Sequence, residues 1–303
     1  MKSLELYKKL YLIRRSEQKI IDHYFDDQMK SPMHMSMGQE AIAVGVLAAL
    51  PDNAPVASTY RTHAIYLART GDTDKFFLEM FGKVGGTSDG KAGSMHLLSP
   101  EHSFFCSTAI VGTNIPVAAG MAFAHKMKGI DIPVVVFFGD GAVDEGVFWE
   151  TLNFSCLNYL NIVFVYEDNN FAVHSPQSER HSYEDITEIV SKFNCNVFCD
   201  HSNDVEEVCR IAESAVSVQN DLPSFLHFEC YRYLEHVGVS EDFNAGYRSK
   251  IEYEEWLKVD PIVLQRRKAL AFTSDEDLSE VESEIDTQIE DSFQKAQDAD
   301  FPE

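Results

Sequence analysis

Two polar side chains follow two apolar runs of the sequence, at the points where the runs end. Asp140 comes directly after Gly139 and the run 133–138, and Asn169 follows the run 161–166. Continuous apolar runs rich in β-branched and aromatic residues are typical of strands buried on both faces of a parallel sheet. A carboxylate and an amide oxygen are ligands that Mg²⁺ accepts together with phosphate oxygens. The two residues therefore indicate a magnesium-bridged diphosphate site.

The surroundings of Asp140 favour ligand binding over a simple turn. Gly139 and Gly141 flank the carboxylate and would let a ligand approach the backbone closely. A helix predicted to begin near Ala142 would direct free N–H groups at the same place. Short motifs often occur by chance, so either turn alone is a weak signal. The 27 residues between Gly141 and Asn169, however, leave room for one helix and one strand, which would bring both side chains to one sheet edge.

The rest of the chain alternates helical and strand-like segments. Apolar periodicity predicts helices over 4–28, 38–50, 116–126, 143–157, 183–193 and 204–218, and strands over 133–138, 161–166, 196–199 and 224–230. Strands that alternate with helices of about 10 to 15 residues indicate a doubly wound, mainly parallel α/β sheet with helices on both faces. Because no Pro- or Ser-rich linker interrupts the alternation, residues 1–273 are predicted to form a single domain.

The composition excludes several classes of protein. Asp and Glu number 49 against 25 Lys and Arg, which gives a formal net charge of -24. Nucleic acid and anionic membranes both favour basic surfaces, so neither is an expected partner. No apolar run approaches the about 18 residues of a membrane span, and the N-terminal segment resembles neither a signal nor a transit peptide. Six cysteines occur singly, as is typical of free thiols in a reducing compartment, so a cytoplasmic location is expected.

Much of the excess acid lies at the C-terminal end. Residues 274–303 hold twelve acidic residues against one basic residue, a net charge of -11. Their apolar side chains, Leu278, Val281, Ile285 and Ile289, recur at helical spacing. We interpret this segment as an acidic helix or tail whose charged side is solvated. Its apolar side would dock on the body of the chain or on a partner.

Several further stretches match a known family in the same order along the chain. They begin at His34 (HMSMGQE), Tyr60 (YRTH), Gly90 (GKAGSMH), Ile110 (IVGTNIP), Tyr231 (YRYLEH) and Gly246 (GYR). The GDG at 139–141 and the pair Asp168-Asn169, which a second Asn follows, resemble the thiamine-diphosphate fingerprint, and the stretches together cover roughly residues 30 to 260. The chain resembles the alpha subunit of the decarboxylating component of 2-oxoacid dehydrogenases, the family of the pyruvate, branched-chain and acetoin enzymes, and is expected to have their thiamine-diphosphate-binding fold.

The resemblance implies a role for each matching position. Asp140, Asn169 and the backbone carbonyl of Phe171 would bind Mg²⁺. Thiamine diphosphate would contact Tyr60, Arg61, Ile110, Val111, Gly139, Asp140, Gly141, Ala142, Asn169, Phe171, Arg232 and His236. Three histidines, His34, His63 and His236, would act as catalytic residues around the reacting carbon, the substrate carboxylate and the diphosphate. His96 would either pack beside the site or only satisfy a loop carbonyl.

The resemblance also implies an activity and partners. The expected reaction is decarboxylation of a 2-oxo acid, with pyruvate favoured, and transfer of the acyl or acyloin unit to a lipoyl group or to a carbonyl such as a sugar intermediate. In this family a glutamate that activates the cofactor comes from a beta subunit. The chain is therefore expected to act only in a heterotetramer of two alpha and two beta chains, with a lipoyl acyltransferase as a further candidate partner. The alternatives are a split transketolase-like subunit and a catalytically silent scaffold.

The departures from the family pattern lie around the substrate entrance. His174 stands where the family has a small residue, and Glu235 replaces the glycine before His236. Asp168 replaces the first Asn of the motif, and Phe171 replaces a tyrosine. These changes lead us to expect a difference in the substrate more than in the cofactor.

Overall fold

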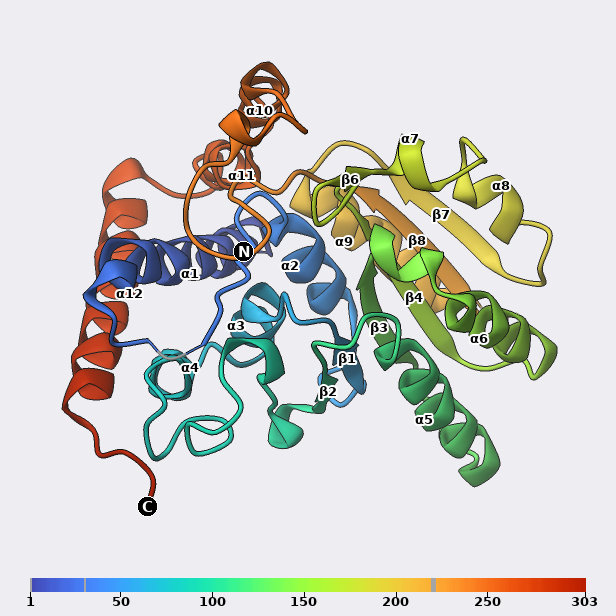
Figure 1. The fold of residues 1–303 in the computed structure, drawn as a ribbon, viewed down its shortest axis with the longest axis horizontal. Helices are drawn as coiled ribbons and strands as arrows, with labels where there is room; N and C mark the ends of the chain where they lie inside the picture. The colour runs from blue at the N-terminus through green and yellow to red at the C-terminus, as the bar shows by residue number, and fades with distance from the viewer. Residues whose placement is uncertain (1, 30, 219–221) are drawn as a thin grey trace.

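A parallel sheet forms the centre of the computed structural model, which describes residues 2–29, 31–218 and 222–303 (Figure 1). The sheet has six strands in the order β2-β1-β3-β4-β8-β7, and all neighbouring strands are parallel. Its strands are β1 (Val56–Ser58), β2 (Phe104–Ser107), β3 (Val134–Gly139), β4 (Ile162–Asp168), β7 (Asn196–Asp200) and β8 (Ser224–Glu229). A separate antiparallel hairpin joins β5 (Phe171–Ala172) to β6 (Ser175–Pro176).

Helices cover both faces of the sheet (Figure 1). One face carries α5 (Asn114–Lys128) and α6 (Gly146–Leu157), and the other carries α2 (Glu40–Ala49) and α9 (Val205–Ser217). Along β3, Val134, Val136 and Phe138 belong to the core beneath α5 and α6. Val135 and Phe137 belong to the core on the opposite face. Because side chains of a strand alternate between faces, burial on both sides requires an apolar residue at every position. The predicted doubly wound parallel fold is confirmed.

Some of the remaining helices have bounds that differ from the predicted ones. The other helices are α1 (Lys2–His23), α3 (His63–Thr70), α4 (Thr73–Met80), α7 (Gln177–Arg180), α8 (Ile186–Val190), α10 (Lys250–Leu257), α11 (Pro261–Ala269) and α12 (Asp275–Asp298). The helix predicted over 183–193 shrinks to α8. The start predicted near Ala142 for the next helix is wrong, because α6 begins only at Gly146. Residues Asp140–Asp144 form a 3-10 turn instead, and the extended Glu145 separates this turn from α6.

The acidic C-terminal helix α12 packs against the body of the chain. It lies along α1 and beside α4 (Figure 1). Leu278, Ile289 and Phe293 are buried in this packing. Lys19 and Arg15 of α1 form ion pairs with acidic residues of α12. The predicted apolar stripe thus contacts the chain itself, which is one of the two surfaces expected for it. In the described parts of the chain, no helix is both long enough and apolar enough to cross a membrane.

Candidate functional site

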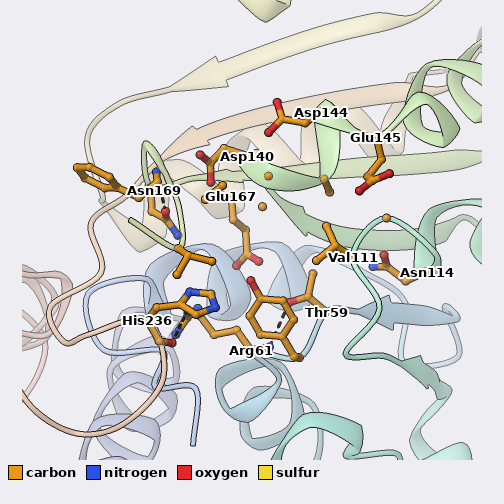
Figure 2. Close-up of a pocket in the computed structure, with 18 of the residues that line it drawn as sticks. Thr59, Arg61, Val111, Asn114, Asp140, Asp144, Glu145, Glu167, Asn169 and His236 are labelled. Atoms are coloured by element: carbon orange, nitrogen blue, oxygen red, sulfur yellow. Dashed lines mark hydrogen bonds between the residues drawn. The ribbon is translucent and has the colours of Figure 1, made fainter. Parts of the chain in front are cut away.

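A cavity of about 260 Å³ opens at the carboxyl ends of β1, β3 and β4 (Figure 2). The chain passes from β1 to β2 on one side of β1 and then returns to β3 on its other side. The cavity therefore lies at a switch point of the sheet, where ligands of such folds bind. All the predicted cofactor-binding residues line it: Tyr60, Arg61, Ile110, Val111, Gly139, Asp140, Gly141, Ala142, Asn169, Phe171, Arg232 and His236. The fold therefore brings together segments that are far apart in the sequence.

Side-chain oxygen atoms that could bind a metal ion lie on the side of the cavity formed by β3 and β4 (Figure 2). Asp140 is 2% exposed and follows β3, and Asn169 follows the neighbouring strand β4. The Asn169 Oδ1 atom accepts a hydrogen bond from the Phe171 N–H at 3.1 Å, and its Nδ2 donates to Gln39 Oε1 at 3.2 Å. An amide oxygen has a second lone pair, so Asn169 can still bind a cation.

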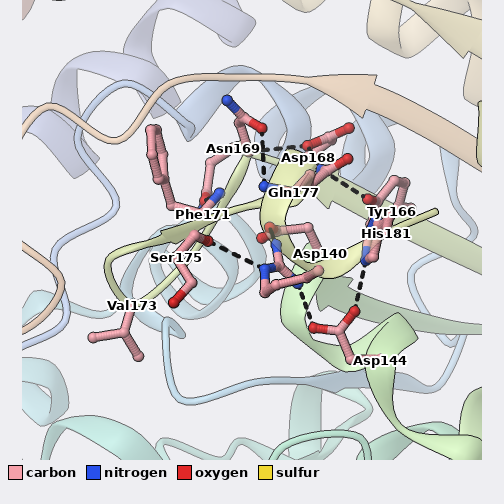
Figure 3. Close-up of polar contacts among 12 residues, drawn as sticks. Asp140, Asp144, Tyr166, Asp168, Asn169, Phe171, Val173, Ser175, Gln177 and His181 are labelled. Atoms are coloured by element: carbon pink, nitrogen blue, oxygen red, sulfur yellow. Dashed lines mark hydrogen bonds and ion pairs between the residues drawn. The ribbon is translucent and has the colours of Figure 1, made fainter. Parts of the chain in front are cut away.

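A basic side chain already lies against the Asp140 carboxylate. The Arg180 guanidinium forms ion pairs with Asp140 and Asp144. Figure 3 shows these two carboxylates with their polar contacts as dashed lines. Burial raises the pKa of Asp140 to about 6, and Arg180 acts in the opposite direction. A buried carboxylate that attracts a cation, together with the amide oxygen of Asn169, fits the oxygen-ligand chemistry of Mg²⁺. Arg180 was not among the predicted site residues, because no sequence motif connects it to this site.

Arg61 lies on the opposite side of the cavity. Its guanidinium donates to the backbone carbonyl of Met35 and, at 3.3 Å, to that of His236. The side chain is buried, and its hydrogen bonds lead to neutral carbonyl groups. Such a guanidinium offers further N–H groups to an anion. Arg61 is thus suited to bind phosphate oxygens.

A second buried guanidinium belongs to Arg232. It donates to the Val173 carbonyl at 3.2 Å and to the Tyr247 hydroxyl at 2.7 Å. Its Nη2 atom lies 4.0 Å from a carboxylate oxygen of Asp242, a long ion pair. Burial, followed by the neighbouring charge of Arg61, lowers the pKa of Arg232 to about 10. Two such cations side by side favour a multivalent anion such as a diphosphate.

Two of the predicted catalytic histidines form an aromatic cluster with Tyr60. The His34 ring lies 4.6 Å from Tyr60 and 5.3 Å from His236, measured between ring centroids. His236 lines the cavity, whereas His34 lies behind it with a buried Nδ1 atom that has no hydrogen-bond partner. Burial, and then the charge of Arg61, lowers the pKa of both rings to about 3. Both imidazoles are therefore neutral near pH 7. In each ring one nitrogen can donate a hydrogen bond and the other can accept one.

The structure does not bring His63 to the cavity, contrary to prediction. Its ring is 0% exposed. Its Nδ1 lies 2.9 Å from a Glu17 oxygen and its Nε2 lies 2.7 Å from Ser94 Oγ. Both nitrogens are engaged inside the protein, which favours a structural role for His63, and its catalytic role stays a prediction. His96 also lies outside the cavity lining, and its Nδ1 is 3.4 Å from the carbonyl of Ser107, the last residue of β2.

We predict that His63→Ala lowers the free energy of unfolding by about 2–4 kcal/mol, because it opens a cavity and leaves the Glu17 carboxylate with one partner fewer. Urea denaturation measures the change. The exposed His102 provides a control, since His102→Ala should change the same quantity by about 0.5 kcal/mol or less. If His63→Ala unfolded like the unaltered chain but lost turnover, the original assignment to the substrate would be restored.

Glu167 is a cavity residue that the sequence analysis did not single out. It points into the cavity between Asp140 and Arg61 (Figure 2). Burial raises the pKa of Glu167 to about 8, and Arg61 acts in the opposite direction. A signal was present in the sequence, because Glu167 stands two residues before Asn169 at the end of one strand. Residues at that spacing point to the same face.

These features are typical of the class of α/β proteins that bind a ligand at the switch point of a parallel sheet. A family model described as "Dehydrogenase E1 component" matches residues 8–303. The chain belongs to this family, whose members are thiamine-diphosphate-dependent oxidoreductases. The family predicted from the motifs is confirmed.

Individual relatives are similar over almost the whole chain. The alpha subunit of the pyruvate dehydrogenase E1 component of Zymomonas mobilis is 33% identical, over 99% of this chain and 85% of the relative. The corresponding subunit of Rickettsia felis is 29% identical, over 99% of this chain and 92% of the relative. The alpha subunit of acetoin:2,6-dichlorophenolindophenol oxidoreductase of Bacillus subtilis is 30% identical, over 99% and 90%. The chain is thus of the alpha-subunit type within the pyruvate and acetoin group.

Proposed function

We propose that the chain is the alpha subunit of a Mg²⁺- and thiamine-diphosphate-dependent enzyme that decarboxylates a 2-oxo acid, pyruvate, and transfers the acyl or acyloin unit to an acceptor. One observation carries the proposal. Every residue expected to bind the cofactor lines a single cavity, whose lining combines oxygen ligands after β3 and β4 with the guanidiniums of Arg61 and Arg232. The relatives named as pyruvate dehydrogenase subunits support pyruvate as the substrate.

Different residues of the cavity lining would bind the metal ion and the diphosphate. Asp140, Asn169 and the carbonyl of Phe171 would hold Mg²⁺, and Arg61 and Arg232 would bind the diphosphate. The Gly141 backbone allows close packing here, since a Cβ atom at this position would meet the Ala172 Cβ at 3.1 Å. When bound, thiamine diphosphate supplies a carbanion that adds to a carbonyl carbon and a ring that accepts the electrons released on decarboxylation.

The histidine cluster would position the substrate. His236 lies at the cavity wall, and its neutral ring can donate a hydrogen bond to a carboxylate or carbonyl oxygen. His34 packs behind it and fixes its orientation through ring contact. The burial of His34 strengthens the polar interactions around the cluster, because the local dielectric constant falls where water is scarce.

The entrance of the cavity presents an apolar surface that a beta subunit would cover. Ile110 is 67% exposed and Val111 42% exposed at the rim, although both side chains are apolar. The surface continues over α5 and α6, where Val117, Phe123, Met127, Phe154 and Leu157 are exposed. Contiguous exposed apolar patches of this kind mark protein interfaces. The named alpha subunits among the relatives imply a beta partner, and its glutamate would reach the cofactor from this side.

We predict that Leu157→Asp weakens the association of the chain with its beta subunit by at least about 10-fold, since a charge would be buried within an apolar contact. Analytical ultracentrifugation or calorimetry measures the affinity. Ile251 on α10 is a matched control, because Leu157 and Ile251 are both 72% exposed but lie on different surfaces. If Leu157→Asp and Ile251→Asp had equal effects, the α5–α6 surface would not be the interface.

Turnover assays test the proposed function. The chain, its beta subunit and the mixture are each supplied with Mg²⁺, thiamine diphosphate and pyruvate, and the release of carbon dioxide is followed. Only the mixture should turn over, and adding a lipoyl domain or a sugar carbonyl identifies the acceptor. Full turnover by the chain alone would overturn the subunit assignment. Ketol transfer without decarboxylation would favour the transketolase-like alternative, and no magnesium-dependent cofactor binding by the mixture would favour the scaffold.

A further inference from the structure

Arg180 occupies a position that neither the motifs nor the family assignment explain. It ends the single-turn helix α7, and its side chain contacts the 3-10 turn that carries Asp140. Its guanidinium pairs with both Asp140 and Asp144, and its Nε donates to the Ser175 carbonyl at 3.1 Å. The side chains of Arg180 and Asp140 are only 13% and 2% exposed, so water screens this contact poorly.

The Arg180 guanidinium and a metal ion would compete for the same carboxylate. Mg²⁺ requires its oxygen ligands at about 2.0–2.1 Å in near-octahedral geometry. One Asp140 oxygen is already bonded to Arg180. A second cation beside a guanidinium in a buried site is repelled strongly, because charges a few ångströms apart interact by several kcal/mol where screening is weak. Mg²⁺ binding to Asp140 is therefore opposed as long as Arg180 keeps its present position.

Asp144 gives Arg180 a second anchor. Its carboxylate binds Arg180 through one oxygen and lies 2.6 Å from His181 Nε2 through the other. Asp144 is more exposed than Asp140, at 33% against 2%. Arg180 can therefore release Asp140 and keep an ion pair at the edge of the cavity.

The backbone of α7 is tied to the proposed metal-binding loop. The Gln177 N–H donates to the Asn170 carbonyl at 3.0 Å, next to Asn169. The Gln177 side chain donates to Asp168 and, at 3.1 Å, to the Tyr166 hydroxyl. These contacts hold α7 in place, so the exchange at Asp140 requires movement of the Arg180 side chain and not of the whole segment.

We propose that Arg180 is a built-in competitor of the divalent metal, which pairs with Asp140 in the cofactor-free chain and makes Mg²⁺ bind well only together with a diphosphate. This proposal rests on the function proposed above. Arg180 neutralises the buried carboxylate when no ligand is present. The negative charges of a diphosphate compensate for having both Mg²⁺ and Arg180 at the site. The two ligands then become coupled, because each binds better when the other is present.

Calorimetry with Mg²⁺ alone, and then with Mg²⁺ in saturating thiamine diphosphate, tests the proposal on the full chain and on its complex with the beta subunit. Arg180→Gln should tighten the binding of Mg²⁺ alone by at least about 10-fold, since a like charge is removed. With the diphosphate present, the change should be about threefold or less, because the diphosphate already offsets the guanidinium. Paramagnetic resonance of Mn²⁺ gives a second measurement that does not depend on turnover.

Two variants control for indirect effects. Arg180→Lys keeps the charge and should keep the weak binding of Mg²⁺ alone. His181→Gln removes a contact to Asp144 without changing Arg180, and should leave Mg²⁺ binding unaltered. Equal binding of Mg²⁺ alone by the unaltered chain and Arg180→Gln would overturn the role of Arg180 while leaving the function intact. Failure of both proteins to bind Mg²⁺, even with thiamine diphosphate and the beta subunit, would instead overturn the proposed function.

Discussion

Asp140→Ala should weaken magnesium-dependent binding of thiamine diphosphate by at least about 100-fold, and turnover with the beta subunit should fall with it. Even residues that only support metal ligands cost about 10- to 100-fold when removed, so a direct ligand should cost no less than the upper limit. Asp140 is buried directly after β3, and β3 itself has no acidic residue that could replace it. Calorimetry with and without Mg²⁺ measures the cofactor affinity.

Asp131 serves as the control for this experiment. It is an exposed acid just before the opposite end of β3, so Asp131→Ala removes the same charge far from the cavity. Its cofactor affinity should match that of the unaltered chain. A variant at Asp140 that kept both its affinity and its dependence on Mg²⁺ would show that the metal is bound elsewhere.

Arg14→Leu should lower the free energy of unfolding by about 3–5 kcal/mol, because it leaves a buried carboxylate without its partner. The Arg14 Nε atom lies 2.6 Å from a Glu40 oxygen, and Glu40 has no exposed surface. A second carboxylate, that of Asp260, lies 3.0 Å from the same guanidinium. Chemical denaturation followed by circular dichroism measures the loss.

The neighbouring residue provides a matched control. Arg15 pairs with Asp286 at the surface, where both side chains are about 40% exposed, at 43% and 40%. Exposed pairs contribute about 0–1 kcal/mol, so Arg15→Leu should have an effect within that range. If the two variants were equally stable, the buried pair would not be a stabilising element of the fold.

The Arg14–Glu40 pair also explains why the stretch His34–Glu40 matters to the site. Glu40 accepts a hydrogen bond from the Gly38 N–H at 2.8 Å and so closes the turn before α2. Gln39, beside it, binds the amide of Asn169 at 3.2 Å. The stretch therefore positions a proposed metal ligand from a distance of 130 residues along the chain. Weakening the pair is expected to disturb the cavity as well as the fold.

The parts of this protein that could be predicted from sequence are those that local chemistry determines. Residues 134–138 of β3 and 162–166 of β4 are all apolar or aromatic, which only a sheet covered on both faces requires. Asp140 and Asn169 end those runs, and adjacent parallel strands bring their ends to one edge. The short strands β1 and β2, with three and four residues, carry too little pattern to be recognised, although β1 leads directly to Tyr60 and Arg61.

The parts that only the tertiary structure decided are the pairings of buried polar groups. His63 and Arg61 stand two residues apart in one motif, yet Arg61 lines the cavity and His63 is enclosed by Glu17 and Ser94. Arg180 meets Asp140 across 40 residues of chain. A buried charge must find a partner, and which one it finds depends on what the fold brings within a few ångströms. Sequence alone thus determined the family, the sheet and the candidate ligands, whereas the packing decided which polar side chains reach the cavity and which hold the protein together.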